Sequence, residues 1–483
     1  MSFEFSKVSL KQISSKIGDG IHGTPIYDDN GSYYFINGNN LGSGRIVITS
    51  STKKVSREEY LKHKKELNES TVLLSINGTI GNVSLFNDEP VILGKSACYI
   101  NVLPDVNVHY IGYVLKDRLF QNYIKQQANG STIKNVSLKL IRDYEFTLPP
   151  RFVQDRIAEI LSSLDKKISV NENMSDILEQ MAQALFKSWF VDFEPVKAKM
   201  AVLEAGGSQE DATLAAMSAI SGKEADALAV FEREHPEQYA ELKATAELFP
   251  SAMQDSELGD IPEGWKFQPF GELLSHTIGG DWGKDESDDK HKMPVRIIRG
   301  TDIPNIKSCQ DSNVPFRYVE EKKLKTRSLN AGDIVIEVSG GSPTQPTGRS
   351  IYVTDEILKR LSLPVEPASF CRLFRPKSKE LGMVLGLHLE KIYQDGKTWL
   401  YQNQSTGISN FQTKVFLENE MVAVAPSEIL KLFYKATLPF VKLMHSSENI
   451  KLTQLRDTLL PKLLSGEITL PEAEQAVSEA ENV

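Results

Sequence analysis

The chain has 483 residues, of which 40% are hydrophobic and 25% charged, and its formal net charge is −9. This length exceeds what a single hydrophobic core usually organises, so two or more domains are expected. The three cysteines, Cys98, Cys309 and Cys371, are too few and too widely spaced for a disulfide framework or a structural zinc site. With no signal peptide and no apolar run near the roughly 18 residues of a membrane span, the protein is predicted to be cytoplasmic.

The negative charge is concentrated in one segment. Residues 201–260 carry 13 acidic and 3 basic side chains, which leaves the rest of the chain close to neutral. Local basic surfaces can therefore form on both sides of this segment. The net charge does not exclude DNA as a partner.

Residues 1–147 are predicted to form a mixed α/β domain. Short runs of β-branched and aromatic residues alternate with Asn- and Gly-rich turns, which is typical of strands. The expected strands are 33–36, 45–49, 71–76, 83–86, 98–102 and 144–148. An apolar face recurring at helical spacing predicts one helix at 108–127.

A long helix is predicted next, within a central segment at 148–199. It begins after Pro149 and Pro150 and runs to about residue 190, because proline fits the start of a helix. Its apolar residues recur about every 3.5 positions, which indicates a coiled-coil seam that needs a partner helix. Asn171 interrupts the seam at its middle, as a residue that fixes helix register would.

The same order of elements recurs from about residue 262, which indicates an internal repeat. The matched segments are 35–38 with 297–300, 72–75 with 334–337, 96–98 with 369–371, and 129–132 with 403–406. The offset grows once, which places an insertion in the second copy between 342 and 369. A second domain is therefore expected at 258–425 and a second helix at 426–466, with Pro439 and Pro461 kinking or interrupting that helix.

The predicted fold class is α+β. Two tandem mixed α/β domains are separated by two long antiparallel coiled-coil helices related by a pseudo-two-fold axis. Residues 200–257 are expected to be a partly helical acidic linker, and 467–483 a disordered or frayed acidic tail. Antiparallel pairing of the two helices would bring Asn171 beside His445 at the centre.

Several motifs carry a resemblance to a known family. They are Leu-Pro-Pro at 148–150, Trp-Phe-Val-Asp-Phe-Glu-Pro at 189–195, Leu-Phe-Pro at 248–250, the segment 255–265, and Leu-Arg-Asp-Thr-Leu-Leu-Pro-Lys-Leu-Leu-Ser-Gly at 455–466. With these motifs and its duplicated layout, the chain resembles the specificity subunit (S subunit, HsdS type) of a Type I restriction-modification system over nearly its whole length.

The resemblance implies a non-catalytic protein that binds double-stranded DNA. Its two target-recognition domains would each read one half of a split sequence, and its helices would act as a ruler between them. Two methylation subunits, which carry S-adenosylmethionine, and two motor-nuclease subunits would assemble on it. The chain itself would hold no cofactor, no metal and no catalytic residue.

Two other functions remain open from the residues. A self-sufficient methyltransferase would need a Gly-rich loop and an Asn-Pro-Pro-aromatic loop, and neither is found. A nuclease could use Asp333 and Glu337 to hold Mg²⁺, but Ser339 stands where a lysine is expected. The alternatives are thus an enzyme whose motif is unrecognised, and a coiled-coil scaffold that does not bind DNA.

Polar side chains on the predicted turns are the candidates for reading DNA, because such groups match base edges and phosphates. In the first domain they are His22, Thr24, Asn37, Asn39, Asn40, Asn77, Thr79, Ser131, Thr132, Lys134 and Asn135. In the second they are Lys292, Arg296, Arg299, Ser339, Ser342, Thr344, Gln345, Arg349, Ser405, Thr406 and Asn410.

Comparing the two copies divides these candidates. Ser131-Thr132 recurs as Ser405-Thr406, so these pairs are expected to hold the backbone or phosphates. Asn37 is replaced by Arg299, so this position is expected to distinguish the half-sites, with Arg299 contacting a guanine. On the first long helix, three outward-facing aromatic residues are candidates for docking a partner: Phe186, Phe190 and Phe193.

Overall fold

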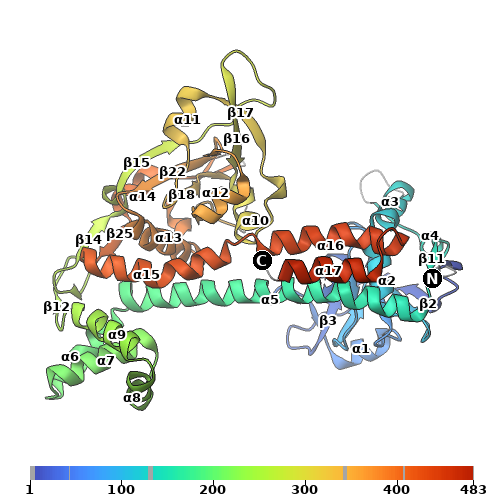
Figure 1. The fold of residues 1–483 in the computed structure, drawn as a ribbon, viewed down its shortest axis with the longest axis horizontal. Coiled ribbons are helices and arrows are strands. Elements are labelled where there is room, and N and C mark those ends of the chain that lie inside the picture. Colours follow the sequence, from blue (N-terminus) through green and yellow to red (C-terminus); the bar gives the residue numbers. More distant parts are fainter. Residues whose placement is uncertain (1–5, 43, 129–133, 341–344, 406–407, 482–483) are drawn as a thin grey trace. The chain divides into compact units, whose positions relative to one another are not determined.

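The computed structural model of the chain describes residues 6–42, 44–128, 134–340, 345–405 and 408–481 (Figure 1). It is a mixed helix and sheet protein that divides into two compact units. Unit 1 comprises Met1–Ser169 with Lys451–Val483, and unit 2 comprises Val170–Ile450. The boundary between the units falls within one continuous helix, α5 (Arg151–Phe190).

Unit 1 is built around a four-stranded antiparallel sheet. Its order is β2 (Ser14–Asp19), β10 (Ala97–Val102), β7 (Thr71–Ser75) and β8 (Val83–Leu85). The two central strands are buried on both faces, since alternate residues point into different cores. Val72 and Leu74 face the core that contains the helices, whereas Leu73 faces a second, smaller core.

A second sheet in unit 1 lines that smaller core. Its order is β6 (Lys54–Val55), β3 (Tyr33–Ile36) and β9 (Val91–Leu93), with β3 and β9 parallel. The remaining pairs are β1 (Ser6–Ser9) with β11 (Glu145–Leu148), and β4 (Leu41–Gly42) with β5 (Arg45–Ile46). The 3-10 turn η1 (Gly38–Asn40) follows β3 directly.

Helices α2 (Val108–Lys116), α3 (Arg118–Gln127), α4 (Leu138–Arg142) and the first part of α5 share the core on one face of the main sheet. Helix α1 (Arg57–His63) instead lies beside β9 of the second sheet. The single helix predicted at 108–127 is divided at Asp117, which ends α2 in an extended conformation. Its carboxylate accepts a hydrogen bond from Leu119 N at 3.0 Å and so begins α3.

Residues 470–481 form a helix, contrary to the frayed tail predicted there. Helix α17 (Leu470–Glu481) follows α16 (Glu448–Ser465). Ala473 and Val477 are buried in the main core of unit 1, and Glu474 forms an ion pair with Arg156 of α5. Acidic residues dominate the composition of this segment, and its apolar face is narrow. Composition alone therefore indicated disorder.

Unit 2 repeats the strand order of unit 1. Its four-stranded sheet runs β15 (Leu274–Gly279), β22 (Cys371–Pro376), β18 (Ile334–Glu337) and β20 (Ser350–Tyr352). Its second sheet runs β17 (Phe316–Glu320), β16 (His291–Ile298) and β21 (Val365–Pro367), with β16 and β21 parallel. The strand pair β14 (Lys266–Pro269) with β25 (Met421–Val424) corresponds to β1 with β11.

Unit 2 also has elements of its own. The predicted insertion contains helix α12 (Asp355–Leu361), which lies between β20 and β21. Two further sheets are β19 (Ser339–Gly340), β24 (Ile408–Phe411) and β23 (Gln402–Ser405), and β12 (Met253–Gln254) with β13 (Ile261–Pro262). Outside the acidic segment and the long helices, the helices and turns of unit 2, of which η3 corresponds to η1 of unit 1, are η2 (Phe270–Leu273), η3 (Gly300–Asp302), α10 (Ile303–Lys307), η4 (Asp311–Asn313), α11 (Glu321–Arg327), α13 (Lys379–Gln394), η5 (Lys397–Tyr401) and α14 (Thr413–Asn419).

The acidic segment is a small helical subdomain of unit 2 and not merely a partly helical linker. Its helices are α6 (Glu194–Glu204), α7 (Gln209–Ser221), α8 (Ala225–Glu234) and α9 (Pro236–Leu248). Helices α7, α8 and α9 enclose a core of their own around Ala216, Met217, Leu228 and Ala246. The buried Lys199 Nζ donates a hydrogen bond to Phe249 O at 2.6 Å, which ties the two ends of the subdomain together.

The second long helix is divided, but not at either proline. Pro439 lies within α15 (Ser427–Met444) and Pro461 within α16, and the break falls between these helices. At the break the His445 ring is buried and its Nδ1 lies 3.2 Å from Thr354 Oγ1, while Arg360 donates to His445 O at 2.8 Å. These contacts fix His445 in the segment between α15 and α16, so that the two helices are not continuous.

The predicted contact between Asn171 and His445 is therefore wrong. Asn171 Nδ2 instead donates a hydrogen bond to Asn449 Oδ1 at 2.9 Å. The polar pair lies one helical turn beyond the expected residue, because His445 belongs to the break and not to the helix.

Candidate DNA interface

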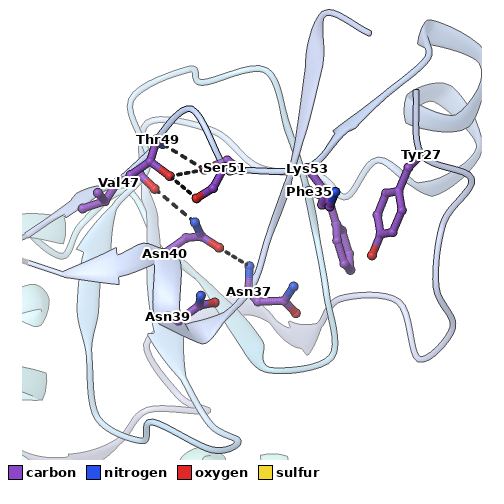
Figure 2. A pocket seen from close by; sticks show the side chains of 10 residues that line it. Tyr27, Phe35, Asn37, Asn39, Asn40, Val47, Thr49, Ser51 and Lys53 are labelled. Carbon is purple, nitrogen blue, oxygen red and sulfur yellow. Dashed lines mark hydrogen bonds between the residues drawn. The ribbon is translucent and has the colours of Figure 1, made fainter. Parts of the chain in front are cut away.

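Three of the predicted DNA-reading residues of unit 1 line one open hollow, which we call the amide pocket (Figure 2). Its volume is about 260 Å³. The pocket is lined by Tyr27, Phe35, Asn37, Asn39, Asn40, Val47, Thr49, Ser51, Thr52 and Lys53. Amides, hydroxyls and one ammonium group thus meet at the end of β3, beside two aromatic rings.

Two of the three asparagines hold turn η1 in place. Asn40 Oδ1 accepts a hydrogen bond from Asn37 N at 3.1 Å, and Asn40 Nδ2 donates to Val47 O at 3.1 Å (Figure 2). Ser96 Oγ donates a hydrogen bond to Asn37 Oδ1 at 2.9 Å and accepts one from Gly38 N at 2.9 Å. The third, Asn39, is exposed and is not used in this way.

Glycine is required at the start of this turn. A Cβ at Gly38 would lie 2.9 Å from Ser75 Cβ and 3.1 Å from Ser96 O. The turn therefore sits directly against the end of the central strand β7. This close approach leaves no room for a side chain at the base of the amide pocket.

A second hollow of unit 1, with a volume of about 270 Å³, gathers His22, Asn77 and Asn135 from three separate loops. Asp19 and Lys95 also line it. His22 Nε2 lies 2.9 Å from Asp19 Oδ2, and Asn77 Nδ2 donates to Asn135 Oδ1 at 3.4 Å. The remaining described candidates of this unit, all exposed, are Thr24, Thr79 and Lys134.

In unit 2, two of the three predicted arginines pair with carboxylates of the fold. Arg299 binds Asp302 through two hydrogen bonds of 2.9 and 2.7 Å, and the ion pair raises the pKa of Arg299. Arg349 binds the buried Glu337 in the same way, at 2.9 and 2.6 Å. Each of these two guanidinium groups is therefore held by a carboxylate of the fold, and the expected contacts of Arg299 and Arg349 with DNA stay predictions.

The other described candidates of unit 2 are only partly engaged. Arg296 donates to Val314 O at 2.9 Å and lies over the Phe316 ring. Ser339 Oγ donates to Asn410 Oδ1 at 2.8 Å across the pair β19 and β24. Lys292 and Gln345 are exposed. Outside the described residues lie Ser131, Thr132, Ser342, Thr344, Thr406 and the side chain of Ser405.

The three aromatic residues expected to dock a partner are buried. Phe186, Phe190 and Phe193 are 1%, 4% and 6% exposed. Their core in unit 2 also holds the aromatic residues Trp189, Phe249, Trp265 and Phe433. They are core residues and not a docking surface, which corrects the prediction.

The exposed apolar residues of α5 lie elsewhere. Val170, Met174, Ile177 and Met181 are 57%, 44%, 56% and 46% exposed. Their spacing of three and four residues places them on one face of the helix. Met174 and Met181 belong to the predicted seam, so the periodic signal was present, but it did not distinguish a buried seam from an exposed one.

The acidic pair considered for a nuclease is neutralised by arginines. Asp333 is bound by Arg375 at 2.7 and 2.9 Å, and Glu337 by Arg349. Over the described ranges no group of three or more His, Cys, Asp or Glu side chains could hold a metal ion. Nor is any helix in the described part of the chain long and apolar enough to cross a bilayer.

The sequence of this chain is similar to those of known proteins. Residues 4–180 match the family model described as the Type I restriction modification DNA specificity domain. The chain is 28% identical over 385 residues to the Type I restriction enzyme HindI specificity subunit of Haemophilus influenzae, covering 77% of this chain and 81% of that protein. It is 24% identical over 411 residues to the MjaIX specificity subunit of Methanocaldococcus jannaschii, covering 83% and 78%.

A solved structure of similar extent is the Type I restriction-modification S subunit from M. genitalium. The match covers 96% of each chain at 17% identity, with a TM-score of 0.49.

Proposed function

We propose that this chain, which belongs to the Type I restriction-modification specificity subunits, reads a split DNA target with one half-site for each β-rich domain. The chain is a non-catalytic subunit. The observation that carries the proposal is that both units have the same strand order and that a polar turn follows the corresponding strand in each. Turn η1 follows β3 in unit 1, and turn η3 follows β16 in unit 2. Two equivalent readers are what a two-part DNA sequence requires.

The paired helices support an antiparallel arrangement with a pseudo-two-fold axis. In unit 2 Asn171 bonds to Asn449 at 2.9 Å, and in unit 1 Asp165 bonds to Arg456 at 2.8 Å. Residue numbers fall along α5 as they rise along α16, as antiparallel helices require. We propose that the coiled-coil pair sets the spacing of the half-sites, so that changing helix length alters the gap and not the bases read.

The exposed apolar stripe of α5 is the proposed docking surface for the methylation subunits, which would carry S-adenosylmethionine. The double substitution Met174→Ser with Ile177→Ser should abolish co-purification of the methylation subunit while leaving the fold intact. Glu172, which is exposed on the opposite side of the helix, supplies the control Glu172→Ser. Equal loss of the partner in both variants would contradict this assignment.

The proposed function is tested by mapping adenine methylation in cells that express this chain with its methylation subunit. A split methylated motif should appear with both subunits and with neither one alone. A contiguous motif would contradict the two-reader account.

Two competing functions predict different results. An enzyme with an unrecognised motif would bind S-adenosylmethionine as a purified single chain and methylate DNA without a partner. A coiled-coil scaffold would show no salt-dependent DNA binding even after the partners are added.

A further inference from the structure

The two units build the same turn from different residues. Turn η1 follows β3 in unit 1, and turn η3 follows β16 in unit 2. In both, the third residue accepts a hydrogen bond from the backbone N–H that precedes the turn. Asn40 accepts from Asn37 at 3.1 Å, and Asp302 accepts from Arg299 at 3.0 Å.

The side chains of the residues that precede each turn therefore already form hydrogen bonds within the fold. Asn37 is bonded to Ser96, and the Arg299 guanidinium is bonded to Asp302. The first position is glycine in both turns. A Cβ at Gly300 would lie 2.3 Å from Glu337 Oε1, just as one at Gly38 would collide with Ser75. Only the second position of each turn is left to face solvent.

Those second positions are Asn39 in unit 1 and Thr301 in unit 2. Both side chains are exposed, and neither forms a hydrogen bond with any described residue. Figure 2 draws Asn39 in the amide pocket without a bond to its neighbours. A free amide offers two donors and one acceptor, and a free hydroxyl offers one donor and an acceptor.

The surroundings of Asn39 suit a DNA duplex. Lys53 is exposed at the same pocket with its Nζ 5.9 Å from the centre of the Tyr27 ring, and it forms no ion pair with any described acidic residue. An ammonium group at this position can contact a phosphate, which positions the protein without reading sequence. An asparagine amide matches adenine N6 and N7 in the major groove, and threonine suits several bases.

We propose that Asn39 reads an adenine in the half-site of unit 1 and that Thr301 reads a base in the half-site of unit 2. Asn37, Asn40, Arg299 and Asp302 are then positioning residues that hold each turn against its sheet. This assignment rests on the proposed function and sharpens it, because it names the reading position within each domain.

The first test compares methylation maps of cells expressing the full chain with its methylation subunit. Asn39→Ala should make one adenine position degenerate in one half-site and leave the other half-site unchanged, and Thr301→Ala should affect only the opposite half-site. The control is Asn87→Ala, an exposed asparagine beyond the other end of the strand pair β3 and β9, which should leave the motif unchanged.

The second test uses the purified complex, so that it also decides the case in which a variant no longer supports methylation. Replacing the relevant adenine of the duplex by 7-deazaadenine removes the N7 acceptor. Wild-type binding should weaken by about 5- to 150-fold at that one adenine. The Asn39→Ala complex should show no such sensitivity.

The outcomes separate this inference from the proposed function. If wild-type cells show no split motif, the proposed function fails. If the wild type shows a split motif, and Asn39→Ala keeps full discrimination at every position and full sensitivity to 7-deazaadenine, only the assignment of Asn39 is overturned.

Discussion

Unit 1 and unit 2 share a strand order but stabilise it with different chemistry. Where unit 1 has Ser75 at the end of its central strand, unit 2 has Glu337, paired with Arg349. The neutral Asn37 and Asn40 of one turn correspond to Arg299 and Asp302 of the other. The position of the turn is thus a property of the sheet, whereas its tolerance of mutation and pH depends on which polar groups support it.

The largest difference should appear at the end of the central strand. In unit 2, Arg349→Met leaves the buried Glu337 without its guanidinium, which should destabilise the unit by about 3–5 kcal/mol. In unit 1, Ser75→Ala removes the hydroxyl that accepts a neutral hydrogen bond from Asn82 N and should cost about 1 kcal/mol. Hydrogen exchange of β18 and β7 measures the two free energies separately.

A matched double variant tests the cause. Glu337→Met combined with Arg349→Met should recover much of the loss, because it removes the unpaired buried charge. An Arg349→Met variant no less stable than Ser75→Ala would show that the ion pair contributes little.

The next difference between the units is how their stability depends on pH. Glu366 on β21 is fully buried, both of its carboxylate oxygens are without a hydrogen-bond partner in the described structure, and burial raises its pKa to about 7. The corresponding residue of unit 1, in the register of the parallel strands, is Ile92. A folded-state pKa above the unfolded value of an acid favours the protonated form.

The direction in which stability changes with pH follows from the linkage between folding and proton binding at Glu366. Below about pH 4.5 both states are protonated and stability is complete, and between about 4.5 and 7 only the unfolded state has lost the proton, so stability falls as pH rises. The total loss is about 3 kcal/mol at most. Opening free energies from hydrogen exchange should therefore fall from pH 5 to pH 8 in β21 and not in β9. Glu366→Met should remove that fall, and an equal fall in the variant would exclude Glu366 as its source.

The smallest effects on stability should distinguish the residue that holds turn η1 in place, Asn37, from the residue proposed to read a base, Asn39. Asn37→Ala breaks the bond to Ser96 and should cost about 1 kcal/mol. Asn39→Ala removes an exposed side chain with no bond to the described residues, so its effect should stay within about 0.5 kcal/mol. Denaturant unfolding of the full chain measures both, and a larger loss for Asn39→Ala would show that this residue supports the fold.

The repeat and much of its strand pattern could be predicted from the sequence. Strands β3, β7, β8 and β10 fall within one residue of their expected bounds, and the predicted insertion contains α12. These features depend on local periodicity and on self-similarity, both of which the sequence displays directly. Helix α5 begins immediately after its two prolines for the same local reason.

The direction of individual side chains could not be predicted, because it depends on distant residues. Asn37 is turned inward by Ser96, and Arg349 by Glu337. Phe186 is buried by aromatic residues from other elements of unit 2, although its helix pattern alone would allow exposure. Asn171 bonds to Asn449 and not to the expected His445, because Thr354 and Arg360 hold His445 in the helix break.

The central claim is that each unit independently reads one half of a split target. It is tested most directly by replacing residues 266–424 with a second copy of residues 6–148, which exchanges β14 through β25 for β1 through β11, and mapping methylation with the same methylation subunit. The account predicts a symmetric split motif whose two halves are inverted copies of the half-site that unit 1 reads in the native chain. An active hybrid that retains the native second half-site would contradict the account.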